Sequence, residues 1–441
     1  MSLKPPEMVW KLQTALHAKA KESPGYRFYS LYDKVYRRDI LEFAYRCCRA
    51  NSGAPGADGQ SFKDIEEYGE TRWLDELTET LRTNAYRADA IRRVYIPKPD
   101  GKQRPLGIPS VRTRVVQTAV MLVLGPIFEA DLPPEQYAYR AERSALDAVR
   151  HVHKLLYAGH MHVIDADLSG YFDSIPHHEL LKSVARRVSD KRILRLVKDW
   201  LQAPVEEADE RGRVRRTTRN KDEGRGCPQG APISPPLANL YMRRFILGWK
   251  SLGNEKRFQA KIVNYADDFV ICCRGNAEQA AAAMRDMMAR LKLTVNEEKT
   301  RVCHVPQEHF DFLGYTLGRC WSRKTGRAYI GTWPSRKKVK RICREISEQT
   351  QRRWTRRDHE TQVAMLNRML IGWSNYFCLG PVSQSYEAID KHCRQRLRQW
   401  LRRKHQTRSL GTSRFSDEYL YKTLGLTRLS VRTRNLPWAK A

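Results

Sequence analysis

The sequence predicts an α+β protein in which a ferredoxin-like sheet is followed by an all-α, strongly basic domain. Helical patterns dominate residues 1–85. Between residues 86 and 320, short apolar runs of strand length alternate with amphipathic helical patterns. The chain is again helical from 331 to 410, where 19 Lys and Arg stand against 6 Asp and Glu. The length of 441 residues suits several domains of roughly 100–200 residues each.

Composition points to a folded protein with a polyanionic partner. Hydrophobic residues make up 41% of the chain, which is enough to build cores. The chain has 80 Lys and Arg against 49 Asp and Glu, a formal net charge of +31. Basic side chains gain free energy by displacing counterions from phosphates, so this excess favours nucleic acid. The alternative is a soluble protein that is simply basic.

Several features bear on the cellular compartment. No segment reaches the roughly 20 apolar residues of a membrane span, so we expect no membrane partner. The nearest candidate, residues 115–128, is interrupted by polar residues, Gly125 and Pro126, and is expected to be a buried helix. The N-terminus has no apolar signal-peptide region, and the ten cysteines contain no C-x-x-C pair. We therefore expect packing cysteines and a reducing compartment, the bacterial cytoplasm or nucleoid.

The central segment contains the elements of a split βαβ sheet. Residues 160–168 form an apolar run that ends in carboxylates, and a helical pattern follows over residues 177–188. A hairpin is expected around residues 265–268, then a helix over residues 276–293 that begins at an Asn276 cap. Residues 310–317 are expected to form the last strand. Strand, helix, hairpin, helix and strand in this order is the ferredoxin-like arrangement.

In that arrangement, acidic residues converge at one edge of the sheet. The end of the first strand, at Asp167, would lie beside the hairpin tip at Asp267 and Asp268. Neighbouring carboxylates repel unless a cation lies between them, and Mg²⁺ takes one or two carboxylates together with waters and phosphates. Two such ions would suit an in-line phosphoryl displacement, and Mn²⁺ is a possible substitute. The alternative is an exposed turn with no function.

Two loops could contact a nucleotide. "GCPQGAPISPP" (residues 226–236) runs into a helix, with Ser234 as the expected N-cap and Pro235 as the first helical residue. Small residues allow close backbone approach to a nucleotide, although a tight structural turn would have the same composition.

The second loop, residues 95–109, has the pattern of a hairpin that turns at Asp100 and Gly101. Its basic residues Lys98, Lys102 and Arg104 are placed to bind a triphosphate. A basic surface hairpin without a ligand would look the same.

These segments, in this order, resemble the successive blocks of reverse transcriptases of the group II intron type. The resemblance covers nearly the whole chain, and the ordered polymerase blocks make it specific. The blocks are GADGQSF (56–62), PKPDGKQRPLGIP (97–109), DADLSGYFDSIPHH (165–178), GCPQGAPISPPLANLYM (226–242), NYADDF (264–269), LTVNEEKT (293–300) and FDFLGYTL (310–317). GWSNYF (372–377) and LRQWLRRKH (397–405) resemble the thumb, or maturase, domain of intron-encoded proteins.

The resemblance implies a right-hand polymerase with palm, fingers and thumb. It implies that residues 1–85 form an N-terminal extension and the start of the fingers, and residues 86–320 the fingers and palm. The thumb or maturase domain would span 321–405, and a short tail, 406–441, could bind DNA. No paired-cysteine nuclease domain is expected in this tail.

The resemblance also assigns site residues. It implies that Asp167, Asp267 and Asp268 are the catalytic, metal-binding carboxylates, with Asp165 in support. Phe172 matches the family's steric gate against a 2′-hydroxyl, although a Phe packed in the core is the plain alternative. Lys98, Arg104 and Gln229 match contacts to the incoming nucleotide.

The implied reaction is RNA-directed DNA synthesis. A primer 3′-hydroxyl would attack the α-phosphate of a dNTP, with two Mg²⁺ as cofactors. The implied partners are an RNA template or intron RNA, a DNA primer or target DNA, and dNTPs, with the oligomeric state left open. A maturase role in RNA splicing is also implied.

Basic helices after residue 330 favour binding of structured RNA, because acids are too few for i,i+4 pairing. A solvated helix face is the alternative. Trp373, Tyr376 and Phe377 have helical spacing and are expected in a core. The expected nucleic-acid-binding residues are Arg336, Lys337, Lys338, Lys340, Arg341, Arg402, Arg403 and Lys404.

Other functions remain open at this stage. The chain could be an RNA-binding splicing cofactor with little polymerase activity, or a reverse transcriptase recruited to defence or repair. An RNA-templated RNA polymerase would more usually show Gly-Asp-Asp at the hairpin, where this chain has Ala266-Asp267-Asp268.

Overall fold

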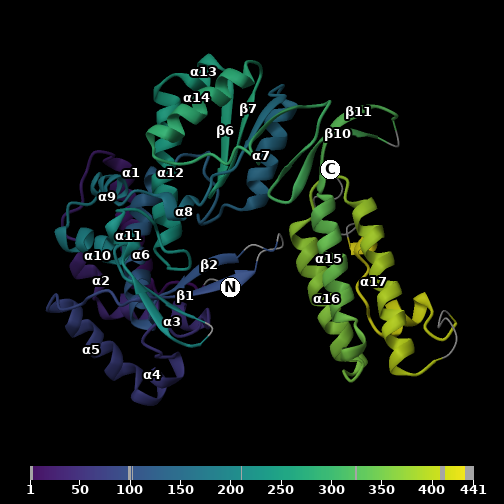
Figure 1. Ribbon diagram of the computed structural model, residues 1–441, viewed down its shortest axis with the longest axis horizontal. Helices are drawn as coiled ribbons and strands as arrows, with labels where there is room; N and C mark the ends of the chain where they lie inside the picture. The colour runs from purple at the N-terminus through teal and green to yellow at the C-terminus, as the bar shows by residue number, and fades with distance from the viewer. Residues whose placement is uncertain are drawn as a thin grey trace.

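A computed structural model describes residues 3–97, 101, 103–209, 211–322, 325–407 and 413–432 of the chain. It has a body of mixed helices and sheets and a separate helical bundle, and a small sheet joins the two (Figure 1). This arrangement confirms the predicted α+β class with an all-α C-terminal part.

The N-terminal region is helical, as the sequence predicts. It packs against α6 (Val111–Asp131), which contacts α1 and α3 in particular. The five helices are α1 (Glu7–Glu22), α2 (Tyr32–Val35), α3 (Arg38–Ala50), α4 (Phe62–Tyr68) and α5 (Glu70–Arg82).

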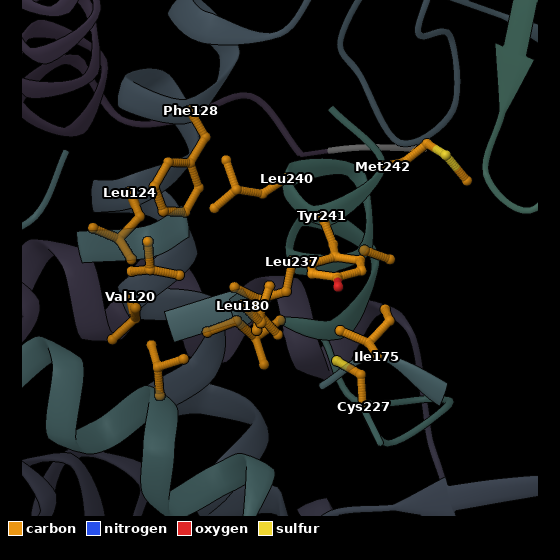
Figure 2. Close-up of a cluster of buried hydrophobic side chains, with 14 of the residues drawn as sticks. Val120, Leu124, Phe128, Ile175, Leu180, Cys227, Leu237, Leu240, Tyr241 and Met242 are labelled. Carbon is orange, nitrogen blue, oxygen red and sulfur yellow. The ribbon is translucent and has the colours of Figure 1, made fainter. Parts of the chain in front are cut away.

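Helix α6 is the centre of the largest core. By length and composition it could also cross a membrane, the one such helix in the described part of the chain, but most of it is buried inside the protein. Figure 2 shows Val120, Leu124 and Phe128 of α6 facing Leu237 and Leu240 of α12 (Ser234–Ser251). These contacts explain the apolar run: it is the core helix that the sequence analysis expects over residues 115–128.

The central sheet is ferredoxin-like and antiparallel, with strand order β6-β7-β3-β8. Alternate residues of its strands face two different cores. On one side lie α12 and α14 (Ala277–Arg290), and on the other lies α7 (Ala145–Tyr157). Burial on both faces explains why three of its strands, β3, β6 and β7, are mostly apolar. The strands are β3 (His162–Ala166), β6 (Ala260–Tyr265), β7 (Asp268–Cys273) and β8 (Arg301–His304).

The prediction that residues 310–317 form the last strand of this sheet is wrong. That place belongs to β8, which pairs with β3. Residues 310–317 instead make a tight hairpin in a second sheet, because Leu313 and Gly314 both have positive φ (50° and 85°), as a type I′ turn requires. This second sheet has the order β11-β10-β9, with β9 (Phe310–Phe312), β10 (Tyr315–Trp321) and β11 (Ala328–Pro334).

The hairpin expected over residues 95–109 is confirmed as β1 (Ile91–Pro97) and β2 (Gln103–Ile108). A second hairpin, which the sequence analysis missed, joins it: β4 (Val205–Ala208) pairs in parallel with β1 and antiparallel with β5 (Val214–Thr217). The resulting sheet has the order β2-β1-β4-β5.

Helices between β3 and β6 complete the body. Of these, α9 contacts both α10 and α12. They are α8 (Tyr171–Ser174), α9 (His177–Ala185), α10 (Lys191–Leu201), α11 (Arg219–Asp222) and α13 (Asn254–Arg257).

The C-terminal bundle has its own core, around Leu366, Tyr386 and Trp400. Phe377 is buried, and Trp373 and Tyr376 pack beside it, so their predicted place in a core is confirmed. The bundle consists of α15 (Arg336–Gln349), η1 (Arg352–Trp354), α16 (His359–Tyr376), α17 (Ser383–Lys404), η2 (Tyr419–Thr423) and α18 (Leu429–Arg432).

Tyrosine hydroxyls attach this bundle to the β9–β10 hairpin. The Tyr315 hydroxyl donates to the Tyr376 carbonyl and accepts from the Cys378 amide at 3.0 Å. The Tyr376 hydroxyl in turn donates to the Leu313 carbonyl at 2.7 Å. These bonds cross between the two halves of the molecule and fix the bundle against the body.

Replacing Tyr315 by Phe should lower the free energy of unfolding by about 1–3 kcal/mol, because three backbone groups, of Tyr376, Cys378 and Leu379, lose a partner. Urea unfolding monitored by Trp fluorescence measures this. Tyr157→Phe is the matched control, since that side chain is 81% exposed. Equal effects of the two substitutions would contradict the attachment role of the Tyr315 hydroxyl.

Candidate active site

Strand pairing brings three carboxylates to one end of the central sheet. The β3–β7 register pairs Ala166 with Phe269, so Asp167 continues β3 where Asp268 begins β7. The β6–β7 register pairs Tyr265 with Asp268, which leaves Ala266 and Asp267 as the hairpin turn. The structure therefore brings Asp167, Asp267 and Asp268 together, as the sequence analysis expects.

Hydrogen bonds of Asn264 fix the turn that contains Asp267. Ala266 has φ 58°, in the left-handed region. The buried Asn264 side chain donates to the Ala266 carbonyl at 2.8 Å. The backbone of Asn264 is itself fixed, because it donates to the Glu135 carbonyl and accepts from the Tyr137 amide. The hairpin is thus supported by the loop that precedes α7.

The carboxylates repel one another. Desolvation of the carboxyl, together with the charges of Asp267, Asp167 and Asp165, raises the pKa of Asp268 to about 7, although the residue as a whole is exposed. Burial also raises the pKa of Asp165 to about 6, against the attraction of Arg301, whose Nε lies 3.6 Å from the Asp165 carboxylate. Negative charge therefore accumulates here beyond what the neighbouring cations neutralise.

Residues after α14 orient Asp167. Asn296 Nδ2 and Lys299 Nζ each lie 3.1 Å from Asp167 Oδ2. The Asp167 amide donates to Thr300 Oγ1 at 3.3 Å. None of these side chains was predicted as a site residue, although they lie in the segment 293–300 that resembles a polymerase block. The Asn-x-x-Lys-Thr spacing after a helix is the signal that could have identified them.

The predicted nucleotide contacts Arg104 and Gln229 lie side by side. Arg104 Nε donates to Gln229 Oε1 at 3.3 Å, and the Gly107 amide donates to the Gln229 carbonyl at 2.6 Å. The loop therefore docks on β2. Gly230 makes this approach possible: its φ is 107°, and a Cβ there would lie 2.5 Å from the Gly107 carbonyl oxygen.

Phe172, five residues after Asp167 in the sequence, contacts this loop through its backbone. It follows β3 in α8, and its carbonyl accepts from the Cys227 amide at 2.7 Å. Its side chain is 8% exposed and belongs to the large core. Phe172 is therefore packed in the core. The predicted contacts Lys98 and Lys102 lie outside the described residues.

Of the two predicted helix caps, Asn276 is confirmed in its position only, and Ser234 is wrong. Asn276 precedes α14 but has φ 51° and makes no capping hydrogen bond. Ser234 is the first residue of α12, after Ile233, and its buried hydroxyl has no hydrogen-bond partner. Neither helix therefore begins with a side-chain capping hydrogen bond.

The predicted nucleic-acid-binding residues occupy two ends of the bundle. Arg336, Lys337 and Lys340 are exposed at the start of α15, and Lys338 packs against Gly314 of the junction hairpin. Arg341 is exposed but pairs with Glu345 at 2.7 Å.

At the far end of the bundle, Arg403 is exposed and Arg402 is half-buried. The Lys404 ammonium donates to the carbonyls of Thr355 and Arg357, so it ties α17 to the loop after α15.

That loop contains exposed basic residues that the sequence analysis missed: Arg352, Arg353 and Arg356. Conversely, several arginines of α17 have structural partners. Arg398 bonds to Asp417 and to the Phe415 carbonyl. The scarcity of nearby acids in the sequence had suggested unpaired charge, but Asp417 lies far along the chain and carbonyl groups accept the remaining donors.

The carboxylate cluster suits a hard divalent cation. In the part of the chain that the structure describes, no three acidic, His or Cys side chains are arranged as a preformed metal cage. Mg²⁺ does not require one, because it takes one or two carboxylates and completes its shell with waters and substrate phosphates. The convergence of Asp167, Asp267 and Asp268 favours a cation, since positive charge would relieve the repulsion that raises the pKa of Asp268.

Comparison with known proteins agrees with this geometry. Residues 96–317 match the family described as "Reverse transcriptase (RNA-dependent DNA polymerase)", and residues 339–418 match "Group II intron, maturase-specific domain".

Several known proteins are similar to this chain, among them two relatives and one solved structure. Protein YkfC of Escherichia coli (strain K12) is 32% identical over 367 residues, which cover 75% of this chain and 93% of that protein. Group II intron-encoded protein LtrA of Lactococcus lactis subsp. cremoris is 26% identical over 352 residues, 66% of this chain and 57% of that protein. A partial Cas6-RT-Cas1–Cas2 complex is 21% identical with TM-score 0.35, covering 59% of this chain and 41% of that chain.

Replacing Asp268 by Asn should stabilise the metal-free protein at pH 8 and have little effect at pH 4. In the folded protein the Asp268 carboxyl has a pKa of about 7, whereas its ordinary pKa is 3.8. Between these two pH values the unfolded chain has lost the proton and the folded protein still holds it, so the folded state loses stability as the pH rises through this window. We expect a gain of about 1 kcal/mol at pH 8, because solvent screens much of the repulsion.

Urea unfolding in EDTA at both pH values measures this gain. Asp286→Asn on the exposed surface of α14 is the control. An equal gain at pH 4 and pH 8 would contradict the electrostatic cause.

Proposed function

The chain belongs to the reverse transcriptases of the group II intron type, and on that premise we propose that it copies an RNA template into DNA by two-metal nucleotidyl transfer. The observation that carries the proposal is the convergence of Asp167, Asp267 and Asp268 at one sheet end. Lys299 and Arg301 do not fully neutralise that cluster, since the pKa of Asp268 stays raised.

The fingers residues supply the nucleotide side of the site. Arg104 and Gln229 already contact each other across β2 and the loop before α12, which supports a shared role in orienting a triphosphate. Arg is suited to this because its planar donors match phosphate oxygens. The Gly230 approach holds that loop against β2, so both side chains are positioned before substrate arrives.

The reaction joins a primer 3′-oxygen to the α-phosphorus of a dNTP. The bond from the α-phosphorus to the bridging oxygen of the β-phosphate breaks, pyrophosphate leaves, and the 3′-hydroxyl proton is lost to solvent. Divalent cations held by Asp167, Asp267 and Asp268 would neutralise charge on the attacking and leaving oxygens. Asn296 and Lys299 orient Asp167, and the supported hairpin fixes Asp267, so the chain contributes mainly positioning.

We also propose that the bundle binds intron RNA and gives the protein a maturase role. The match of residues 339–418 to the maturase-specific domain supports this. So do the exposed basic residues at both ends of the bundle, at the start of α15 and around Arg353, Arg356 and Arg403. Such side chains bind phosphates without reading sequence, so the structured RNA is recognised by its shape.

Asp267→Ala should abolish Mg²⁺-dependent dNTP incorporation on a primed RNA template and leave RNA affinity within about twofold. The carboxylate acts on the reacting phosphate, whereas the basic surfaces that bind RNA lie elsewhere. Single-turnover primer extension and filter binding measure the two effects. Asp286→Ala serves as the matched control, because it removes an aspartate that pairs with Arg290 on α14.

The wild-type protein decides the wider proposal. If it binds RNA tightly but extends no primer in Mg²⁺ or Mn²⁺, the polymerase proposal fails. The chain would then be an RNA-binding splicing cofactor on a reverse transcriptase fold.

The double substitution Lys337→Gln and Lys340→Gln should weaken binding to structured RNA. It should also reduce the steepness of log K against log salt by about 1 to 2, because fewer counterions are released on binding when phosphate contacts are lost. Lys11→Gln with Lys63→Gln is the control, since both are exposed lysines outside the bundle, and each pairs with a glutamate of its own helix. A salt slope that falls equally in both proteins would contradict a specific role for the start of α15.

A further inference from the structure

Tyr139 is an exposed aromatic residue in a loop beside the site, between two residues whose side chains are buried. It lies between α6 and α7 and is 53% exposed. Its neighbours are not: Ala138 is 1% exposed, and the Arg140 side chain is 6% exposed. The loop therefore directs one aromatic side chain outward while its flanks are fixed in the protein.

Buried hydrogen bonds hold both flanks of Tyr139. Arg140 makes a bidentate pair with Glu129, at 2.6–3.1 Å, and donates to the carbonyls of Pro133 and Gln136. On the other side, Asn239 Nδ2 of α12 donates to the Ala138 carbonyl at 2.6 Å. Such a frame leaves little freedom to the backbone between its two fixed points.

The frame forces Tyr139 into an unfavourable backbone conformation. Its φ is 56°, in the left-handed region that glycine or asparagine adopts more readily. Among the described residues with positive φ, Tyr139 is the only aromatic one. Since the ring is exposed, it does not offset this strain by filling the core. Strain of this kind is concentrated at functional sites.

The surroundings of Tyr139 are those of the active site. Partial burial and the charge of Asp267 raise the pKa of the Tyr139 hydroxyl; Tyr265 and Asp268 act in the same direction, and Arg104 opposes them. The charges of the β6–β7 hairpin and of Arg104 therefore both act on Tyr139. The loop that carries it is also the one that supports the hairpin through Asn264.

We propose that Tyr139 is a positioning residue whose ring packs against a nucleoside held between the β1–β2 hairpin and the carboxylates. The inference rests on the proposed polymerase function and adds a contact to its substrate. Aromatic rings bind nucleosides by stacking without regard to sequence, which suits a polymerase that must accept every base. The nucleoside belongs either to the incoming dNTP or to the primer terminus, since Tyr139 lies near groups that would serve both.

Tyr139→Gly tests this, because it removes the ring and at the same time relieves the backbone. We expect thermal stability equal to or above that of the wild type, with kcat/KM for dNTP incorporation lower by about 5- to 150-fold, the range measured for lost base stacking. Tyr139→Phe restores most of the activity, because the ring is retained. Glu142→Gly is the matched control: it has φ 58° in the same loop and is exposed, so it relieves similar strain without removing a ring.

Two arms identify the nucleoside. A rise in KM for dNTP with unchanged primer–template affinity assigns it to the incoming nucleotide. Weaker quenching of a 2-aminopurine placed at the primer 3′ end assigns it to the primer terminus.

For the dNTP, the corresponding signal is the quenching of a 2-aminopurine deoxynucleoside triphosphate that binds to the protein in the presence of a non-extendable primer on its template. Neither fluorescence measurement requires turnover, so both still decide the role of Tyr139 if the wild-type protein proves inactive.

Wild-type kinetics and wild-type quenching in Tyr139→Gly would overturn the proposal. So would a loss of activity that is matched by a loss of thermal stability, because the ring would then be structural.

Discussion

The antiparallel pairing of β3 with β7 is the constraint on which the site depends. Its register places Asp167 and Asp268 at the same sheet end, and the alternation of side chains places them on the same face. A slip of one residue would turn Asp167 to the opposite face and destroy the cluster. Burial of both strands between two cores prevents this slip, because each face has its own apolar set. The packing of α7, α12 and α14 is therefore a condition of the chemistry.

The same convergence works against folding. Bringing Asp165, Asp167 and Asp268 together raises carboxyl pKa values, so the ionised protein carries electrostatic repulsion that a neutral core would not have. Arg301 and Lys299 offset part of it. They leave the cluster incompletely neutralised, which is the state a cation-binding site requires before its ligand arrives. Stability and function are thus opposed at this sheet end.

The convergence of the carboxylates could be predicted from the sequence because it follows from local patterns. Apolar runs bounded by acids and a hairpin identify the strands, and the order of elements identifies the sheet. The fourth strand was misplaced, because β8 is short and polar at its ends, while residues 310–317 look more like a strand and instead turn at Leu313 and Gly314. The apolar pattern of a segment predicts that it forms a strand, but it does not predict which sheet the strand joins.

Contacts between distant segments could not be predicted for a different reason. The pairing of β4 with β1 and the bonds of Asp417 to Arg398 join residues that no local pattern relates. The exposure of Tyr139 is of the same kind, since the sequence does not reveal a backbone held at positive φ by buried side chains from two other elements.

The path from the carboxylates to the basic bundle is short and stiff, and this connects the two proposed activities. β8 brings Arg301 to Asp165, and β9 begins six residues after β8 ends. The hairpin that follows bonds to Tyr376 of α16, and Ser335, which precedes α15, donates its amide to the Gly314 carbonyl. The start of α15 is therefore fixed relative to the sheet that holds the carboxylates. RNA bound there would be presented to the active site at a set distance, because buried strands and hydroxyl bonds, and no long linker, lie between them.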